Sequence, residues 1–236
     1  MSKGLVLCFL GIVCSSFAVP TPTKCQASSS DCITQSARSF LPLLADGAVT
    51  PELKPLDPLF LDHIESKSQK IKFSANNVKV KGLRECNVLN VSRDALNSKL
   101  NINLLCSIFI EGLYEIKGKI QNLPLDSQGR LTLVFDNIWI LIEADLGEVE
   151  HNGQRHWDII NWDFNYTIKN KANVELSNLF NGSVKPTPEI KESLGSSLTE
   201  LIGEIGPPIM KAIVKDAIGT VNNYFHLVPA EDFAFD

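Results

Sequence analysis

The sequence predicts an α+β fold in which a long, curved antiparallel β-sheet wraps around one long C-terminal α-helix. From Ile71 to Ile168 an apolar residue occupies nearly every second position, which is typical of strands with one buried face. Between Pro188 and Phe225 apolar residues recur instead every three or four positions, as on one side of a helix. This arrangement creates an extended apolar interior, which favours carrying a lipophilic molecule over catalysis.

The chain opens with features typical of a secretory signal peptide. Lys3 supplies a positive charge, Leu5–Val13 forms a short apolar core, and Ser16–Ala18 offers small residues at the cleavage positions. The apolar run is shorter than the about 20 residues that cross a bilayer, and no other stretch reaches that length. We therefore expect residues 1–18 to be removed and residues 19–236 to form one secreted, extracellular domain.

The charge balance restricts the partners of the mature chain. Cleavage after Ala18 removes Lys3 and no acidic residue, which moves the formal net charge from -5 to -6. A mildly acidic surface disfavours nucleic acid and anionic membranes as partners. The sequence holds no Gly/Ser linker, low-complexity tract or clear repeat, which agrees with a single domain, expected to be a monomer.

The signal peptide takes two of the six cysteines, and four remain. Cys25 and Cys32 enclose a short Ser-rich loop and are predicted to form a disulfide that ties down the start of the mature chain. If a hairpin turns near Leu96, Cys86 and Cys106 lie opposite each other, so they are either bridged or two buried free thiols. Neither pair has the close spacing of a zinc site.

Helix and turn signals organise the chain before and within the strands. Apolar residues at helical spacing predict a helix over Ile33–Leu44, which Asp46-Gly47 ends. Three prolines within 51–58 exclude helix there, and strands are expected from Ile64 onward. The run from Asp126 to Gly129 predicts a turn between two later strands.

Asn152-Gly153 is the strongest hairpin signal in the sequence. A two-residue turn there sets Leu141 opposite Phe164 and Trp139 opposite Tyr166, so that aromatic residues gather on one face of the sheet. This face is either packed core or part of a ligand site. We take as candidate ligand contacts its members and two residues of the C-terminal helix, namely Trp139, Leu141, Trp162, Phe164, Tyr166, Leu198 and Leu201.

Three N-glycosylation sequons begin at Asn90, Asn165 and Asn181. A glycan projects into solvent, so a modified Asn165 requires the aromatic residues on either side of it to face inward, in agreement with the hairpin. A glycan on Asn90 conflicts with the register of the hairpin near Leu96, because the pairing that sets Cys86 opposite Cys106 also sets Asn90 opposite Ile102. Either Asn90 is unmodified or a β-bulge intervenes.

The C-terminal helix is predicted to be interrupted once. Its first half follows Pro188 at steps of three and four residues, and Gly206-Pro207-Pro208 must kink or break it. About 35 helical residues would extend roughly 50 Å at 1.5 Å per residue. A compact ball cannot bury such a helix, so we expect an elongated molecule.

Chemistry-bearing motifs are absent from the sequence. It has no GxSxG elbow, HExxH motif, P-loop or Rossmann glycine pattern, and its carboxylates form no recognisable acid/base pair. His151 and His156 flank the Asn-Gly turn and could bind a metal, but histidines in a hairpin loop are more often solvated. We therefore predict no enzymatic activity, no catalytic or metal-binding residues and no cofactor.

Several short motifs, each weak by itself, follow one another in a recognisable order. These motifs are Pro55–Leu59, Val80–Leu83, Tyr114–Gly118 and Leu176–Gly182. The Cys25-x6-Cys32 pair and the first helix come before the motifs, and the long terminal helix comes after them. In this order the mature chain resembles the insect takeout and haemolymph juvenile hormone-binding protein family over essentially its whole length. The Asn-Leu-Phe-Asn-Gly segment and the lack of a cysteine after Cys106 favour the takeout-like branch.

The resemblance implies a TULIP-like fold, related to the lipid-binding domains of the bactericidal/permeability-increasing protein type. It implies an internal hydrophobic tunnel, and a gate that includes the helix Ile33–Leu44, tethered by Cys25 and Cys32. An isoprenoid that buries about 300 to 400 Å² gains roughly 7 to 10 kcal/mol, so micromolar binding needs no charged anchor. A single hydroxyl, such as that of Tyr114 or Tyr166, could orient a polar end.

The predicted function is a secreted carrier in haemolymph or another extracellular fluid. Its partner is a hydrophobic small molecule, such as a juvenile hormone-like sesquiterpenoid, a fatty acid or a quinone-type lipid, held in the tunnel. The alternative is a secreted signalling or immune factor that recognises a receptor or a lipid surface. Neither function involves nucleic acid or integral membrane association.

Overall fold

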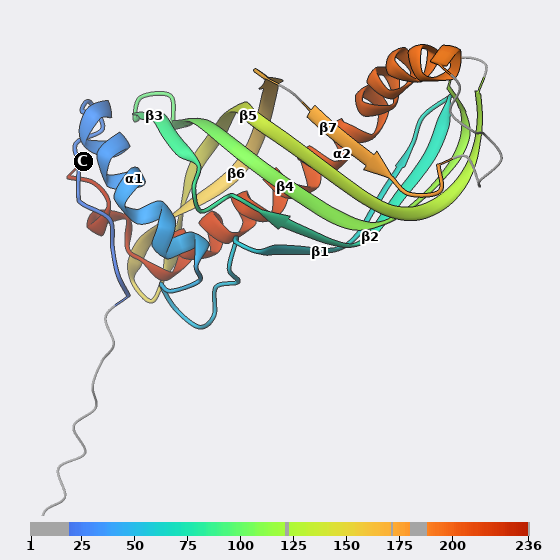
Figure 1. Ribbon diagram of the computed structural model, residues 1–236. Helices are drawn as coiled ribbons and strands as arrows, with labels where there is room; N and C mark the ends of the chain where they lie inside the picture. Colours follow the sequence, from blue (N-terminus) through green and yellow to red (C-terminus); the bar gives the residue numbers. More distant parts are fainter. Residues whose placement is uncertain (1–18, 121–122, 171, 180–187, 236) are drawn as a thin grey trace, which may run out of the picture.

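The computed structural model describes residues 19–120, 123–170, 172–179 and 188–235, with side chains in the last range described from residue 199 onward. The predicted signal peptide, the sequon at Asn181 and the side chain of Leu198 lie outside the described residues. Figure 1 shows the elements, which are α1 (Ser30–Ala45), β1 (Leu59–Lys67), β2 (Ile71–Lys81), β3 (Asn87–Asp94), β4 (Lys99–Ile120), β5 (Leu123–His151), β6 (Gln154–Ile168), β7 (Ala172–Leu176), α2 (Pro188–Leu227) and the short 3-10 helix η1 (Ala230–Asp232).

The strands form an antiparallel sheet that curves around α2, as the sequence predicts (Figure 1). The strand order is β1-β2-β4-β5-β6, while β3 pairs with β4 and β7 pairs with β5. The two central strands, β4 and β5, are 22 and 29 residues long, so each can pair with two shorter strands along one edge. This pairing produces an elongated sheet, with β3 at one end and the β1–β2 hairpin toward the other.

Register shifts help to curve the sheet. They occur between Asn76 and Lys79, between Val88 and Asn90, between Cys106 and Ile108, and between Asp145 and Leu146. A β-bulge of this kind bends its strand and increases the local twist. The strands can therefore follow the helix rather than run flat beside it.

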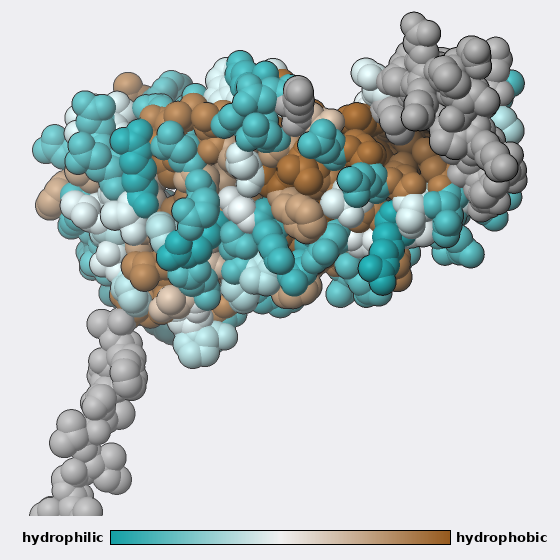
Figure 2. Space-filling view, viewed as in Figure 1, coloured by the Kyte–Doolittle hydropathy of each residue, from teal (hydrophilic) through white to brown (hydrophobic). Residues whose placement is uncertain are grey.

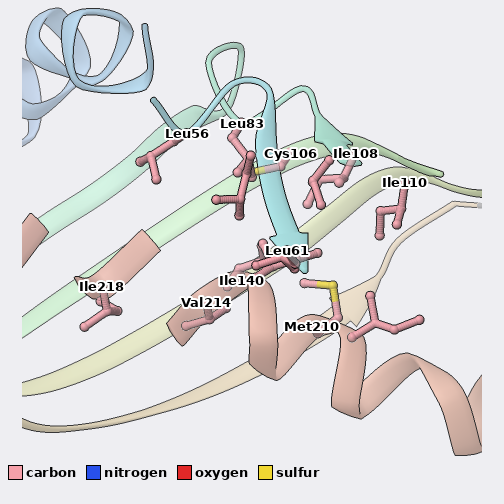
Figure 3. Close-up of a cluster of buried hydrophobic side chains, with 14 of the residues drawn as sticks. Leu56, Leu61, Leu83, Cys106, Ile108, Ile110, Ile140, Met210, Val214 and Ile218 are labelled. Atoms are coloured by element: carbon pink, nitrogen blue, oxygen red, sulfur yellow. The ribbon is translucent and has the colours of Figure 1, made fainter. Parts of the chain in front are cut away.

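The helix α2 lies in the concave side of the sheet and provides much of the core. Figure 3 shows Met210, Val214 and Ile218 of α2 among sheet residues that include Leu61 and Ile140. All five side chains are buried. With 40 residues, α2 extends roughly 60 Å at 1.5 Å per residue. The long terminal helix and the elongated shape are therefore confirmed.

The helix is continuous through Pro207 and Pro208 and does not break there. A proline inside a helix removes one backbone hydrogen bond, which costs about 3 kcal/mol or more. The adjacent Ile205 and Ile209 are only 1% and 0% exposed. Their burial against the sheet holds the chain on its helical path across the two prolines.

The helix α1 covers the free edge of β3. The hydroxyl of Thr34 donates to the carbonyl of Val91 at 3.2 Å and accepts from the Val91 N–H at 2.8 Å. The guanidinium of Arg38 donates to the carbonyls of Val88 and Leu89 at 2.7 and 3.3 Å. These contacts satisfy backbone groups that an edge strand leaves unpaired, so α1 completes the end of the sheet.

The motifs of the family resemblance hold distant segments of this fold together. One carboxylate oxygen of Asp57 accepts hydrogen bonds from the backbone N–H groups of Gly82 and Arg84, both at 2.9 Å. The hydroxyl of Tyr114 donates to the carbonyl of Ser177 at 2.8 Å. The Asp57–Gly82 and Tyr114–Ser177 bonds each join one motif to another, and Arg84 directly follows its motif, so these residues stabilise the fold.

Several predicted local features are confirmed. The first helix runs from Ser30 to Ala45, and Asn152 and Gly153 form the β5–β6 turn with φ of 52° and 77°. The predicted disulfide between Cys25 and Cys32 is present. Cys86 and Cys106, for which the sequence left a bridge and two free thiols open, are also bridged. The bulge between Val88 and Asn90 resolves the conflict at the first sequon: Asn90 pairs with Asn103 and is exposed.

The predicted turn at Asp126–Gly129 is wrong, because β5 runs through it. These residues pair one by one with β4, from Lys117 opposite Asp126 to Tyr114 opposite Gly129. Leu125 and Ser127 are buried and Asp126 and Gln128 exposed, so the run is a strand with one polar face despite its turn-like composition. The first strand also starts earlier than expected, at Leu59.

Candidate ligand-binding site

A cavity of about 250 Å³ lies at the end of the molecule where α1, β3 and the C-terminal residues meet. Figure 1 shows the C-terminus beside α1 at this end. An apolar cavity of about 150 Å³ is enough to bind benzene. The present cavity therefore has room for a larger apolar body, and its walls come from three parts of the chain.

The first wall is the N-terminal segment together with one side of α1. Its helical residues follow at steps of three or four and are mostly aliphatic, which is the pattern of an amphipathic helix turned toward an interior. Leu56, from the proline-rich connection, joins them. The α1 members are Ile33, Ser36, Ala37, Phe40, Leu41 and Leu44.

The second wall is the inner face of the sheet. Alternate residues of a strand point to the same side. Here the alternate residues of β4 are aliphatic, and β3 contributes Val88, Val91 and Arg93. The β4 members are Leu100, Ile102 and Leu104, and Ile142 of β5 and Trp157 of β6 complete the wall.

The third wall is the end of α2 and the segment after it, which together form an aromatic cluster. The ring of Phe233 stacks on Trp157 with 4.9 Å between centroids, and it meets Tyr224 and Phe225 edge-on at 5.6 and 5.3 Å. Phe40 of α1 lies 4.9 Å from Tyr224. Aromatic pairs in these arrangements contribute about 0.5 to 1.5 kcal/mol each beyond their burial, so the cluster stabilises this wall of the cavity.

The two ends of the described chain cover the cavity together. The N–H of Cys25 donates to the carbonyl of Phe233 at 3.1 Å, and the N–H of Phe235 donates to the carbonyl of Cys25 at 3.4 Å. The hydroxyl of Tyr224 donates to the carbonyl of Pro20 at 2.7 Å. Because the Cys25–Cys32 disulfide joins this segment to α1, the cover is connected to all three walls.

Polar groups around this end are paired. Burial, assisted by the negative charge of Asp232, raises the pKa of the Tyr224 hydroxyl far above its usual value, so the group stays a neutral donor. Outside the cavity, Asp158 accepts hydrogen bonds from Asn222 at 3.0 Å and from His226 at 2.8 Å. These two bonds hold the pKa of the Asp158 carboxyl below its usual value and tie β6 to the end of α2.

The predicted register of the β5–β6 hairpin is wrong beyond Leu146. Near the turn Leu146 pairs with Ile159 as predicted, but a bulge follows, so that Trp139 pairs with Thr167 and Leu141 with Asn165. An extra residue in one strand reverses which residues share a face. Phe164 and Tyr166 of β6 are therefore paired with the buried Ile142 and Ile140. Trp139 and Leu141 lie on the opposite, outer face of β5.

Trp139 makes polar contacts on that outer face. Its indole N–H donates to the side-chain oxygen of Asn103, and the ammonium of Lys169 lies 4.7 Å from its ring centroid. Neither Trp139 nor Leu141 lines the cavity. Asn165 is exposed on the same outer face, which agrees with the position expected for a glycan.

The other predicted contacts lie together on the inner face but away from the cavity. Trp162, Phe164 and Tyr166 are half-buried on β6, and the rings of Phe164 and Tyr166 stack at 6.3 Å. The Tyr166 hydroxyl lies against Gly206 of α2, and Leu201 is buried in the core. These residues pack β6 and the core against the middle of α2. Apolar side chains also reach the surface along the middle of the face shown in Figure 2.

Sequence reasoning missed most of the cavity residues. Helical periodicity does identify two of the walls, because it predicts both the first helix, Ile33–Leu44, and the C-terminal helix, which ends near Phe225. It gives no sign that Phe233 folds back onto Trp157, because their contact depends on the path of the chain after α2. Tyr114, considered as an orienting hydroxyl, does not line the cavity and is bonded to Ser177.

The described residues offer little for other chemistry. Among them, no group of three or more His, Cys, Asp or Glu side chains is arranged to hold a metal ion. His156 is buried, not solvated, and its Nδ1 lies 3.3 Å from the carbonyl of Phe225. As far as the helices are described, neither α1 nor α2 has an apolar stretch long enough to cross a membrane.

Comparisons with known proteins agree with this architecture. The chain is 25% identical over 237 residues to the circadian clock-controlled protein daywake of Drosophila melanogaster, covering 91% of this chain and 87% of that protein. The Drosophila yakuba daywake protein is 24% identical over 234 residues, with the same coverage. The crystal structure of takeout 1 of Epiphyas postvittana superimposes with a TM-score of 0.80 at 24% identity, covering 90% of this chain and 99% of that one, and it supports the fold.

The family assignment rests on a match that spans nearly the whole sequence. The model of the family described as haemolymph juvenile hormone binding protein matches residues 5–234. The resemblance to this family and to takeout proteins, first indicated by the order of short motifs, is thereby confirmed. The chain belongs to the haemolymph juvenile hormone-binding protein family.

Proposed function

We propose that this protein is a secreted carrier that encloses a hydrophobic small molecule in the cavity beneath α1. The observation that supports it best is the lining of the cavity, which is aliphatic and aromatic apart from a few polar side chains. Burial of apolar ligand surface in such a site provides about 25 cal/mol per Å². A sesquiterpenoid, a fatty acid or a quinone-type lipid supplies the required surface.

The arrangement of the cover supports a carrier that holds its ligand away from water. Backbone hydrogen bonds connect the cover between Cys25 and the segment of Phe233 to Phe235. A ligand enters when these bonds and the Tyr224–Pro20 bond open, and it is held when they close. Residence time is then governed by the opening of the cover, as in other sites closed by mobile segments.

Secretion is part of the same proposal. The N-terminal sequence is typical of a signal peptide, and the two disulfides suit an oxidising compartment. Asn90 and Asn165 are both exposed and are the sequons we expect to be used. Enzymatic removal of N-glycans from protein secreted by insect cells should lower its mass, and substitution of each asparagine by glutamine assigns the sites.

The decisive experiment is to express the chain in insect cells and to identify what co-purifies with it. Native mass spectrometry should show a bound small molecule, and solvent extraction should release a lipid. Absence of any extractable lipid, combined with failure of the stripped protein to bind added fatty acid, sesquiterpenoid or quinone, would exclude the carrier function and favour a receptor-binding factor.

A cavity-filling variant tests the location of the site. Ala217 of α2 lines the cavity, and Ala217→Phe places a ring in that space. We expect at least a tenfold loss of affinity for the co-purifying lipid. Ala212, five residues earlier and half-buried against the core, does not line the cavity. Ala212→Phe is the matched control, and it should bind normally once its folding is verified by circular dichroism.

A further inference from the structure

The cavity beneath α1 ends before it reaches the middle of α2. On α2 its lining begins at Ala217, and Ile213, one helical turn earlier, is not part of the lining. On β5 the lining residue is Ile142, whereas Ile140, which faces the same side of the strand, is not part of the lining. Together with Val214, these two isoleucines form the inner boundary of the cavity. We call Ile140, Ile213 and Val214 the floor.

The floor is closely packed against the core behind it. Ile140, Ile213 and Val214 are only 3%, 2% and 3% exposed. Figure 3 shows Val214 and Ile140 in one cluster with Leu61 and Met210. Protein interiors are packed as densely as organic crystals, and extra methylene groups inserted into them force side chains out of their rotamers. A ligand therefore cannot extend past the floor without disrupting the core.

The volume of the cavity limits how much of a ligand it encloses. A cavity of about 150 Å³ holds benzene, which has six carbon atoms, so at the same space per atom the present cavity accommodates about ten. A longer chain has to leave through the cover at the opposite side, where it meets water. The part of the chain outside gains little, because only apolar surface removed from water contributes to affinity.

We propose that the floor limits the ligand to an apolar body of about ten carbon atoms. This inference rests on the carrier function and specifies its ligand class as medium-chain fatty or short isoprenoid compounds, rather than long-chain fatty acids or polyprenyl quinones. Each enclosed methylene group raises the affinity about fourfold. The rise stops at the chain length that fills the space above the floor.

A homologous series of straight-chain acids tests this limit. Dissociation constants of the delipidated protein are measured by isothermal titration calorimetry for the even-numbered acids from hexanoic to hexadecanoic acid, below their critical micelle concentrations. All members carry the same head group, so differences between them report on the chain. We expect the affinity to rise about fourfold per methylene group up to decanoic acid and by less than about twofold per methylene group beyond it.

Two isoprenoid acids distinguish the type of chain. Geranic acid has the same number of carbon atoms and the same head group as decanoic acid, so the tighter of the two identifies the preferred chain. Farnesoic acid is one isoprene unit longer than geranic acid. Full enclosure of five more carbon atoms would raise the affinity roughly a thousandfold, and we expect less than about tenfold.

Variants assign the limit to the floor. Ile213→Ala removes three carbon atoms from the floor, and because the space collapses only in part, the chain length at which the rise stops should increase by about two carbon atoms. Val214→Ala removes two and should act in the same direction with a smaller loss of stability. Ile116→Ala is the matched control, because Ile116 of β4 is 1% exposed and does not line the cavity. It should keep the original chain length, and circular dichroism verifies the folding of all three variants.

Three results would overturn the inference while leaving the carrier function in place. These are an affinity that rises fourfold per methylene group up to hexadecanoic acid, an unchanged chain length in both floor variants, and the same increase in Ile116→Ala as in Ile213→Ala. Failure of every acid to bind to the unmodified protein would instead contradict the proposed function itself.

Discussion

The backbone N–H of Cys25 lies 3.1 Å from the carbonyl oxygen of Phe233, joining the first described residues to the last. Cys25 is bonded to α1 through Cys32, and Phe233 stacks on Trp157 of the sheet. One backbone contact thus links helix, sheet and both ends of the described part of the chain across the cavity. The exchange of a ligand should depend on this region, and the following predictions separate its role from that of the general core.

Removal of the Tyr224 hydroxyl should loosen the cover. Tyr224→Phe deletes the 2.7 Å bond to Pro20, which we expect to lower the free energy of unfolding by about 1 kcal/mol. The dissociation rate of a bound fluorescent fatty-acid analogue should rise severalfold in stopped-flow measurements. Tyr114→Phe is the control, because it deletes a similar bond, 2.8 Å to Ser177, outside the cavity. An equal acceleration in both variants would mean that stability, and not the cover, controls release.

The two disulfides should differ in their effects. Loop-closure entropy predicts that replacing both cysteines by serine lowers the free energy of unfolding by about 2.5 kcal/mol for Cys25–Cys32 and about 3 kcal/mol for Cys86–Cys106, whose separations are 7 and 20 residues. Only the first bridge belongs to the cavity wall. Its removal should therefore accelerate ligand release, while removal of the second should chiefly lower the urea midpoint. Faster ligand release on removal of Cys86–Cys106, but not on removal of Cys25–Cys32, would contradict this assignment.

One buried hydroxyl should contribute to the anchoring of α1 to β3, beside the bonds of Arg38. Thr34 is 5% exposed and both donates to and accepts from the backbone of Val91. Thr34→Val keeps the shape but leaves the Val91 N–H and C=O without this partner, which should cost about 1 to 3 kcal/mol. The Val91 amide should lose protection in hydrogen exchange. Thr34→Ser keeps the hydroxyl and should restore most of that protection; if it does not, the methyl group matters more than the bonds.

The Asp158 carboxylate should contribute stability that depends on pH. Its pKa is lowered in the folded protein, so its contribution is fully present above the unfolded value of about 3.9 and is lost as pH falls through the lower folded value. The side chain is 35% exposed, so solvent screening limits the effect. We expect Asp158→Asn to lower the free energy of unfolding by about 1 kcal/mol at pH 7. The difference from the unmodified protein should shrink below pH 4, and urea unfolding at both pH values measures it. A difference that grows on acidification would contradict the assignment.

Close approach of two strands should make Gly118 intolerant of a side chain. Its φ is +140°, and an added Cβ would lie 2.2 Å from the carbonyl oxygen of Lys70. Gly118→Ala should therefore destabilise the protein by more than about 2 kcal/mol, since the backbone itself must shift. Gly219 of α2 has no atom within 4 Å of such a Cβ, and Gly219→Ala should stabilise the protein by about 0.5 to 1 kcal/mol through helix propensity. Thermal unfolding should show a lower midpoint temperature for Gly118→Ala and a higher one for Gly219→Ala.

Periodicity in the sequence predicted the architecture because it reports burial along each element. The alternation from Ile71 to Ile168 and the helical spacing up to Phe225 gave the curved sheet and the helix within it, and the Asn152-Gly153 turn was placed correctly. The same information failed one step further along the hairpin. A single extra residue in β6, Ile160, lies between the pairs Asp145–Asn161 and Leu146–Ile159. It sets Phe164 opposite the buried Ile142 instead of Leu141, and no local pattern marks that bulge.

The sequence by itself therefore determined the main helices, the alternation of the sheet, the Cys25–Cys32 disulfide and the family, since these depend on residue type and spacing along the chain. Tertiary structure alone decided the location of the candidate site. Trp157 and Phe233 are far apart in the sequence, and Arg93 lies on a third segment, yet the rings and the guanidinium stack at one end of the cavity. Contacts of this kind depend on the position of strand bulges and on the path of the chain ends. Packing of the whole molecule determines both, and no local run of residues does.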